Sequence, residues 1–117
     1  MTDVQGKTFQ LSVKDNKVAY LKMDVPNESM NTLKAEFADE ISEILAELKS
    51  NQELVGVVLH SGKDGSFVAG ADINMLAKCQ TAEEAAALSR QGQRVFDQIA
   101  ALPIPVVAAI DLSLIHI

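Results

Sequence analysis

Two short apolar runs, at 54–61 and 104–110, constrain the fold of this chain more than any other feature. Each is rich in Val, Ile, Leu and Ala and nearly continuous, which is typical of a strand buried on both faces of a sheet. Between them, Thr81 and Glu84 form a capping-box pattern that opens a helix, and Pro103 ends it. A strand, a helix and a second strand in this order predict a right-handed crossover between parallel strands.

The amino-terminal part predicts a hairpin. Residues 7–14 and 17–24 alternate apolar and polar side chains, which is the pattern of half-buried strands. Asp15 and Asn16 lie between them and favour a turn. We therefore expect two antiparallel strands before the parallel part of the sheet.

Two further helices complete the expected order. Asn31 or Thr32 can cap a helix that runs to about Lys49, with apolar residues on one face and a solvated acidic face made by Asp39, Glu40, Glu43 and Glu47. A short helix is expected over 71–78. The pattern predicts an α/β domain with a mostly parallel sheet and flanking helices.

Composition limits the classes of function. The chain has 117 residues, enough for one domain, and a formal net charge of −6. This acidity argues against binding to nucleic acids or to anionic membranes. Cys79 is the one cysteine, which fits a reducing compartment. Neither a secretory leader nor a membrane span is visible, so a cytoplasmic location is expected.

The segment Ser66 to Ile73, SFVAGADI, carries the chemistry. It follows a predicted buried strand and opens a predicted helix. The small side chains of Ala69, Gly70 and Ala71 allow a ligand to approach the backbone. Amide groups at a helix start have no intrahelical acceptor, so they suit an oxyanion such as the enolate oxygen of a thioester. Tight packing of a strand–loop–helix turn explains the same residues equally well.

The segment Val68 to Ile73 resembles the signature loop of the crotonase superfamily, the enoyl-CoA hydratases and isomerases. Three other segments match this superfamily in order: 30–33, 54–61 and 102–110. The likeness covers about residues 7–111 and implies the amino-terminal half of the crotonase-like spiral fold. Within the superfamily, the chain is most similar to the alpha subunits of bacterial multifunctional fatty-acid oxidation complexes.

The resemblance implies a substrate, a reaction and a site. The substrate would be a 2-enoyl-CoA thioester, to which water is added in fatty-acid β-oxidation. The backbone N–H of Ala71 would be one of two oxyanion donors. The resemblance also implies that four residues line the channel for the thioester and its pantetheine chain: Ala69, Gly70, Asp72 and Ile73. It implies that Met30 touches the CoA nucleotide.

The chain departs from the superfamily pattern at Asp111. There the superfamily continues into a Gly-rich turn with the second oxyanion donor, and its two catalytic glutamates follow later. This sequence has Leu112-Ser113-Leu114 instead. We therefore interpret 1–111 as a partial domain and 112–117 as a non-native or frameshifted tail, and we expect the chain alone to be inactive.

Two alternatives stay open. The chain can be a non-catalytic acyl-CoA-binding or assembly fragment, or it can belong to a protein with another crotonase-type reaction. The resemblance implies no cofactor for hydration, with NAD used only in a dehydrogenase domain that this chain lacks. It also implies an oligomer in the full-length protein, with a thiolase beta subunit as a partner.

Other candidate residues have structural interpretations. Asp72 is best explained as a helix cap, and His60 as a structural residue at the end of a strand. Cys79 has no histidine partner in a recognisable pattern, so we do not expect a nucleophile. Met23 and Met75, like Met30, are most simply core or channel filler. No spacing of His, Cys, Asp and Glu indicates a metal site.

Overall fold

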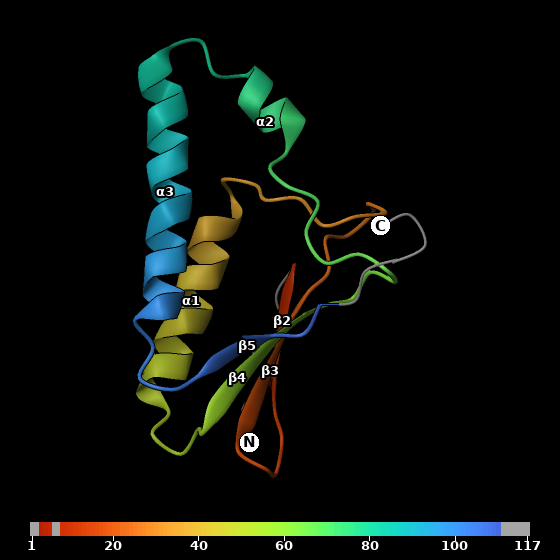
Figure 1. Ribbon diagram of the computed structural model, residues 1–117, viewed down its shortest axis with the longest axis vertical. Coiled ribbons are helices and arrows are strands. Elements are labelled where there is room, and N and C mark those ends of the chain that lie inside the picture. Colours follow the sequence, from red (N-terminus) through yellow and green to blue (C-terminus); the bar gives the residue numbers. More distant parts are fainter. Residues whose placement is uncertain (1–2, 6–7, 111–117) are drawn as a thin grey trace.

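The computed structural model describes residues 3–5 and 8–110, with side chains from residue 8 onward. Asp111 and the predicted tail 112–117 lie outside these residues, so the predicted domain boundary stays a prediction. The described elements, in chain order, are β1 (Asp3–Gln5), β2 (Phe9–Val13), β3 (Val18–Met23), α1 (Phe37–Ser50), β4 (Gly56–Ser61), α2 (Ile73–Ala77), α3 (Ala82–Ala100) and β5 (Val106–Ala108) (Figure 1).

The strands form one sheet in the order β1-β2-β3-β4-β5. The first three strands pair antiparallel, which confirms the predicted hairpin of β2 and β3. β3, β4 and β5 are parallel neighbours, so each connection between them crosses the sheet through helical segments. The predicted α/β class is confirmed. β1 is an additional strand that the sequence did not predict.

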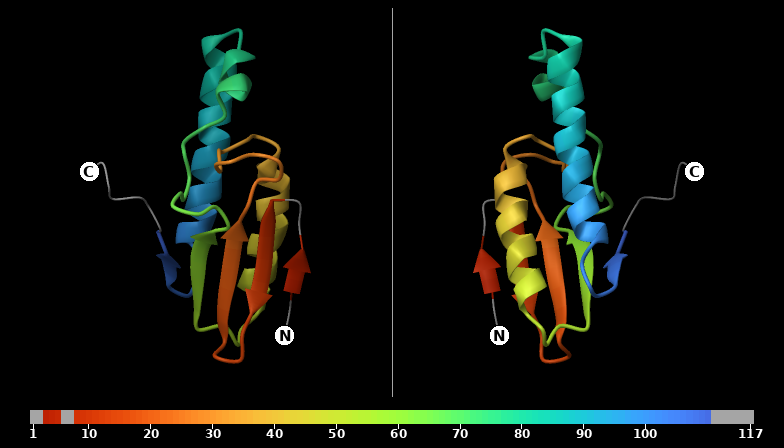
Figure 2. Two further views of the ribbon diagram at one scale, coloured as in Figure 1. Left: turned by 90° about the vertical axis from the view of Figure 1, so that its right-hand side faces the viewer. Right: turned by 90° about the vertical axis from the view of Figure 1, so that its left-hand side faces the viewer.

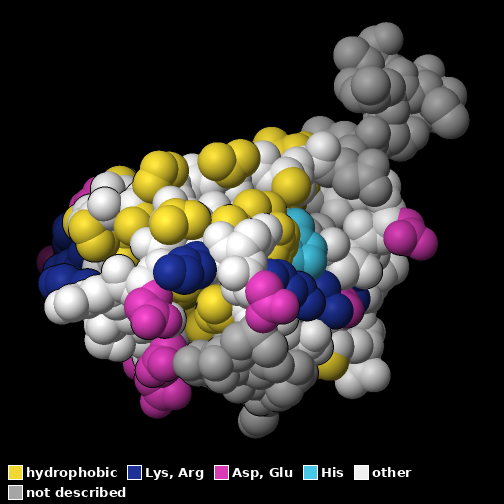
Figure 3. Space-filling view, turned by 90° about the horizontal axis from the view of Figure 1, so that it is seen from below, with side chains coloured by type: hydrophobic (Ala, Val, Ile, Leu, Met, Phe, Trp, Pro, Cys, Tyr) yellow, Lys and Arg dark blue, Asp and Glu magenta, His cyan; other side chains and the backbone are white. Residues whose placement is uncertain are grey.

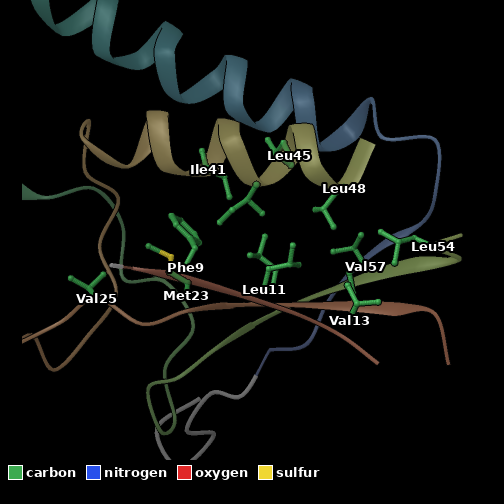
Figure 4. Close-up of a cluster of buried hydrophobic side chains, with 13 residues drawn as sticks. Phe9, Leu11, Val13, Met23, Val25, Ile41, Leu45, Leu48, Leu54 and Val57 are labelled. Carbon is green, nitrogen blue, oxygen red and sulfur yellow. The ribbon is translucent and has the colours of Figure 1, made fainter. Parts of the chain in front are cut away.

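Both long helices lie on the same face of the sheet, with α1 and α3 side by side (Figures 1 and 2). The apolar core lies between this face and α1 (Figure 4). α1 contributes Ile41, Ile44, Leu45 and Leu48 to it, as the three- and four-residue spacing predicts. The rest of the core is Phe9, Leu11, Val13, Ala19, Leu21, Met23, Val25, Leu54 and Val57.

The two apolar runs form strands, but the prediction that these strands are buried on both faces is wrong for the described part of the chain. In β4 only Val57 is buried, and in β5 Val107 is 59% exposed. The reason is that the described helices cover a single face of the sheet. β5 is also an edge strand of the described sheet. Hydrophobic side chains are correspondingly visible on the surface (Figure 3).

The predicted start of the first long helix is wrong. α1 begins at Phe37, after Glu36, which makes no side-chain capping bond. Asn31 is fully buried and hydrogen-bonded elsewhere, and Leu33 forms an isolated parallel bridge with Ala71. Since 31–33 is held by the loop around Ala71, the helix begins only beyond it.

One of the two hydrogen bonds of the predicted capping box of α3 is present. The hydroxyl of Thr81 accepts from the Glu84 amide at 3.1 Å, while the Glu84 carboxylate accepts from the Gln80 amide at 2.8 Å instead of reaching Thr81. The apolar residues of α3 are only partly covered. Val95 and Ile99 pack against the core, whereas Phe96 is 56% exposed.

The acidic face of α1 is solvated with one exception. The Glu40 carboxylate accepts hydrogen bonds from the amides of Thr8 and Phe9, both at 3.0 Å. It therefore ties the helix to the start of β2, and the interpretation of Glu40 as a solvated residue is wrong. Phe9 also contacts Phe37 edge to face, with ring centroids 5.9 Å apart.

Candidate functional site

The site lies where two parallel strands end. β3 and β4 are in register at Met23 and Ser61, their last residues. The loops that follow both strands therefore begin at the same edge of the sheet, the edge at which α/β proteins bind ligands. The amide of Gly62 donates to the Met23 carbonyl at 3.0 Å, which joins the two loops at their start.

Ala71 lies in the second loop, before α2, in an extended segment that pairs with Leu33. The Leu33 amide donates to the Gly70 carbonyl at 2.8 Å, and the Asp72 amide donates to the Leu33 carbonyl at 2.9 Å. Successive amides of an extended chain point to opposite sides, so the Ala71 N–H points away from Leu33. Among the described residues, no acceptor takes this N–H.

An apolar cavity of about 560 Å³ lies beside this segment. The loop contributes Phe67, Val68 and Ala71 to its lining, and Lys34 is the charged residue among the described side chains that line it. The other lining residues come from β2, β3, β4, the segment before α1 and the three helices, including Phe9, Met23, Leu33, Ala35, Phe37, Ile41, Leu59, Met75, Leu88, Val95, Phe96 and Ile99. The cavity can hold an apolar chain next to a free backbone donor.

The other predicted site residues do not line this cavity. Ala69 and Gly70 are exposed loop residues, and Gly70 has a φ of 97°, a conformation that favours glycine. Ile73 is 79% exposed and Met30 is 50% exposed. The structure thus places 69–72 in one loop and Ile73 at the start of α2, but of these residues it brings only Ala71 to the cavity. The roles predicted for these residues stay predictions.

Asp72 is the N-cap of α2, which confirms its structural interpretation. One carboxylate oxygen accepts from the Asn74 amide at 2.9 Å, and the other contacts the Lys34 ammonium at 2.7 Å. Lys34 also contacts Glu28 at 3.0 Å. Since α2 has only five residues, its dipole is weak, and the backbone amide itself is the stronger anion-binding feature.

The Lys34–Asp72 pair predicts a pH dependence of stability. Hydrogen bonds to Asp72 and then Glu28 raise the pKa of Lys34 above 10.5, and the bond from Lys34 holds the pKa of Asp72 below 3.8. The Asp72 contribution is therefore present above pH 3.8 and is lost as the pH falls through the lowered pKa. The Lys34 contribution is present below pH 10.5 and is lost as the pH rises through the raised pKa.

We expect Asp72→Asn, which keeps an oxygen for the cap, to lower the urea midpoint between pH 5 and 9. The difference from the wild type should shrink as the pH is taken well below 3.8. Urea unfolding over a pH series measures it. Glu28→Gln serves as a control, since Glu28 is the more exposed partner, at 40%. A difference of the same size at every pH would refute the ion pair as its cause.

Sequence reasoning missed Lys34 and the hydrogen-bonding role of Asn31. Lys34 reaches Asp72 across 38 residues of sequence, and the Asn31 side chain reaches Phe67 across 36. No local spacing carries such contacts. The sequence signal that could have pointed to both residues was their position in or next to segment 30–33, which matches the superfamily.

The remaining candidates keep their structural interpretations. His60 stacks edge to face with Tyr20, and burial, followed by the charge of Lys22, lowers its pKa. Cys79 is half-buried beside an open groove between α2 and α3 that also contains Lys78 and Arg94. Within the described ranges, no three His, Cys, Asp or Glu side chains gather as metal ligands. No helix in the same ranges is long and apolar enough to cross a membrane.

Solved structures with this arrangement define the fold class. An enoyl-CoA hydratase from Geobacillus kaustophilus superposes with a TM-score of 0.81 at 20% identity, covering 92% of this chain and 39% of that chain. An enoyl-CoA hydratase/carnithine racemase from Magnetospirillum magneticum gives 0.78 at 24% identity, covering 91% and 39%. This chain is a crotonase-fold α/β protein.

Sequence comparison gives the family. The model of the enoyl-CoA hydratase/isomerase family matches residues 13–111. The fatty acid oxidation complex subunit alpha of Shewanella oneidensis is 62% identical over 105 residues, and that of Shewanella halifaxensis is 57% identical over 105 residues. Each match covers 90% of this chain and 15% of the relative. The chain belongs to the enoyl-CoA hydratase/isomerase family, and it spans about 15% of the length of these relatives.

Proposed function

We propose that this chain supplies one oxyanion donor and an apolar acyl pocket to an enzyme that adds water to 2-enoyl-CoA thioesters in fatty-acid β-oxidation. The observation that carries the proposal is Ala71, which precedes α2 and is one of the residues that line the apolar cavity. Its amide has no acceptor within the described residues. The names of the Shewanella relatives support the pathway.

The proposed reaction uses polarisation of the thioester. The Ala71 N–H donates to the thioester oxygen, on which negative charge develops as water adds to the β-carbon. A fixed donor needs no reorganisation as this charge develops, so it stabilises the charge more than mobile water does. Apolar groups around the cavity hold the acyl chain. Asp72 is occupied by Lys34 and the helix cap, so it holds the loop and has no acid or base role.

The other catalytic groups would belong to the rest of the full-length enzyme. By the superfamily resemblance, a second donor and two catalytic glutamates would follow Asp111, so we propose that the 117-residue chain alone has no hydratase activity. Hydration needs no cofactor, and NAD would serve a separate dehydrogenase domain. An oligomer with a thiolase beta subunit and a cytoplasmic location are further parts of the proposal.

A hybrid protein tests this function. In it, residues 13–111 of this chain replace the matching segment of the Shewanella oneidensis alpha subunit, and we call it the hybrid subunit. We expect it to hydrate crotonyl-CoA, measured by loss of the ultraviolet absorbance of the enoyl thioester. The isolated 117-residue chain should show no hydration above background. A correctly folded hybrid subunit without hydratase activity would contradict the proposal.

The alternative is an acyl-CoA-binding or assembly fragment without catalysis. The cavity and the exposed side chains around β5, such as Val107 and Ile110, favour it for the isolated chain. Calorimetric titration of the 117-residue chain with hexanoyl-CoA separates the two versions. Heat of binding supports the binding fragment, while its absence, together with concentration-dependent association, supports assembly.

A further inference from the structure

The side chain of Asn31 is a buried junction between the two loops of the site. Its exposed fraction is 0%. The amide nitrogen lies 2.9 Å from three oxygens, the Met23 carbonyl, the Ser61 hydroxyl and the Phe67 carbonyl, which share its two hydrogens. The amide oxygen accepts from the Val25 amide at 3.0 Å. One side chain thus joins the ends of β3 and β4 to the start of the loop that contains Ala71.

The backbone of the same segment continues this connection toward Ala71. The Asn31 carbonyl accepts from the Ala69 amide at 2.7 Å. Two residues later, Leu33 pairs with Ala71, and its two bonds hold the residues on either side of Ala71 at 2.8 and 2.9 Å. Asn31 therefore fixes the incoming half of the loop, and Leu33 fixes the half that carries the free amide.

Removal of this side chain is expected to be costly. Because Asn31 is fully buried, its removal leaves the Val25 amide and the Phe67 carbonyl without their partner. A buried polar group without a partner is costly, so the loop would shift until these groups find others. A donor that stabilises a developing charge loses much of its effect when it moves by about 1 Å.

We propose that Asn31 is a positioning residue that sets the place of the Ala71 amide. Asn31 does not touch the substrate in this scheme. Its side chain acts through the Phe67 carbonyl, and its backbone carbonyl holds the Ala69 amide, so both contacts fix the path of the loop. The inference rests on the proposed oxyanion role of Ala71, and it adds a residue whose effect on the reaction passes through the backbone.

The test compares Asn31→Asp with Thr32→Val in the hybrid subunit. Asn31→Asp keeps the acceptor for Val25 but turns the donor into a carboxylate facing the carbonyls of Met23 and Phe67. We expect kcat to fall about 10- to 100-fold with KM changed less than about 3-fold. Thr32 is the matched control, because its hydroxyl has no partner within the described residues. Thr32→Val should leave both constants within about 2-fold.

A vibrational measurement separates positioning from general damage. The carbonyl stretch of bound, ¹³C-labelled hexanoyl-CoA reports how strongly the oxyanion donors polarise the thioester. We expect Asn31→Asp to move this band back toward its frequency in water, and Thr32→Val to leave it unchanged. If Asn31→Asp does not fold, Ser61→Ala replaces it, since it removes one acceptor of Asn31. Ser61→Ala should lower kcat about 2- to 5-fold with a smaller shift of the band.

The outcomes distinguish this inference from the proposed function. An inactive wild-type hybrid refutes the function, and the ¹⁵N–¹H resonance of Ala71 in the ligand-free hybrid then tests Asn31 by itself. A shift of that resonance in Asn31→Asp, or in Ser61→Ala, supports positioning. A folded Asn31→Asp variant with wild-type kcat, carbonyl band and Ala71 resonance would overturn it.

Discussion

Replacing Ala71 by proline in the hybrid subunit should lower kcat about 100- to 1,000-fold. Proline has no N–H, so this change deletes the proposed donor while the apolar lining of the cavity remains. Loss of one donor to an oxyanion costs about 3–4 kcal/mol of barrier stabilisation. The loss should appear in kcat more than in the affinity for hexanoyl-CoA, because the charge on the oxygen grows in the transition state. Steady-state hydration of crotonyl-CoA gives both constants.

Ala71→Ser is the matched control, since it adds polar volume at the same residue and keeps the N–H. We expect its kcat within about 5-fold of the wild type. Equal losses in the proline and serine variants would mean that side-chain volume, and not the amide, matters here. A proline variant with wild-type kcat would eliminate Ala71 as a donor.

Local spacing predicted those features of this chain that depend on neighbours in sequence. The hairpin follows from alternation around Asp15 and Asn16, and it is present as β2 and β3. Thr81 and Asp72 cap their helices because a hydroxyl or carboxylate can reach an amide two or three residues ahead. Such contacts need no knowledge of the rest of the fold.

Contacts across long stretches of sequence were not predictable in this way. Asn31 has the residue type and the place of a helix cap, yet its side chain bonds to Phe67 and its backbone to Ala69. Burial favours the junction between the loops over a helix cap. A buried amide must satisfy all its polar atoms, and only the assembled loops offer enough partners. The first turn of the expected helix is lost as a consequence.

Burial of the parallel strands shows a second limit of prediction from the sequence. The run 54–61 is apolar on both faces, but covering a face requires an element on that side. In the described residues, α1 and α3 share one face, so Val58 and His60 on the other face of β4 stay half-buried. The apolar pattern thus specifies a strand that can be covered twice, and cannot specify what covers it. The same holds for the cavity, whose walls come from separate segments.

The largest expected effect on stability comes from Leu11→Ala. Leu11 is 1% exposed, lies on the central part of β2 and faces α1 (Figure 4). We expect the free energy of unfolding to fall by about 2–5 kcal/mol, since a packed core collapses only partly into the space left by a leucine. This is a large share of the stability of about 5–15 kcal/mol that is usual for a domain. Urea unfolding of the 117-residue chain, followed by far-ultraviolet circular dichroism, measures it.

Val55→Ala is the control for this change, because Val55 is 58% exposed and should cost less than about 0.5 kcal/mol. Leu11→Met conserves most of the volume and should cost less than about 1.5 kcal/mol. The register links this core position to the site: Leu11 lies opposite Leu21, and Leu21 opposite Leu59, which lines the cavity. A loss below about 1 kcal/mol in Leu11→Ala would show that the cross-strand neighbours Leu11, Leu21 and Leu59 are not tightly packed. The cavity beside Ala71 would then lack the rigid floor that a fixed oxyanion donor requires.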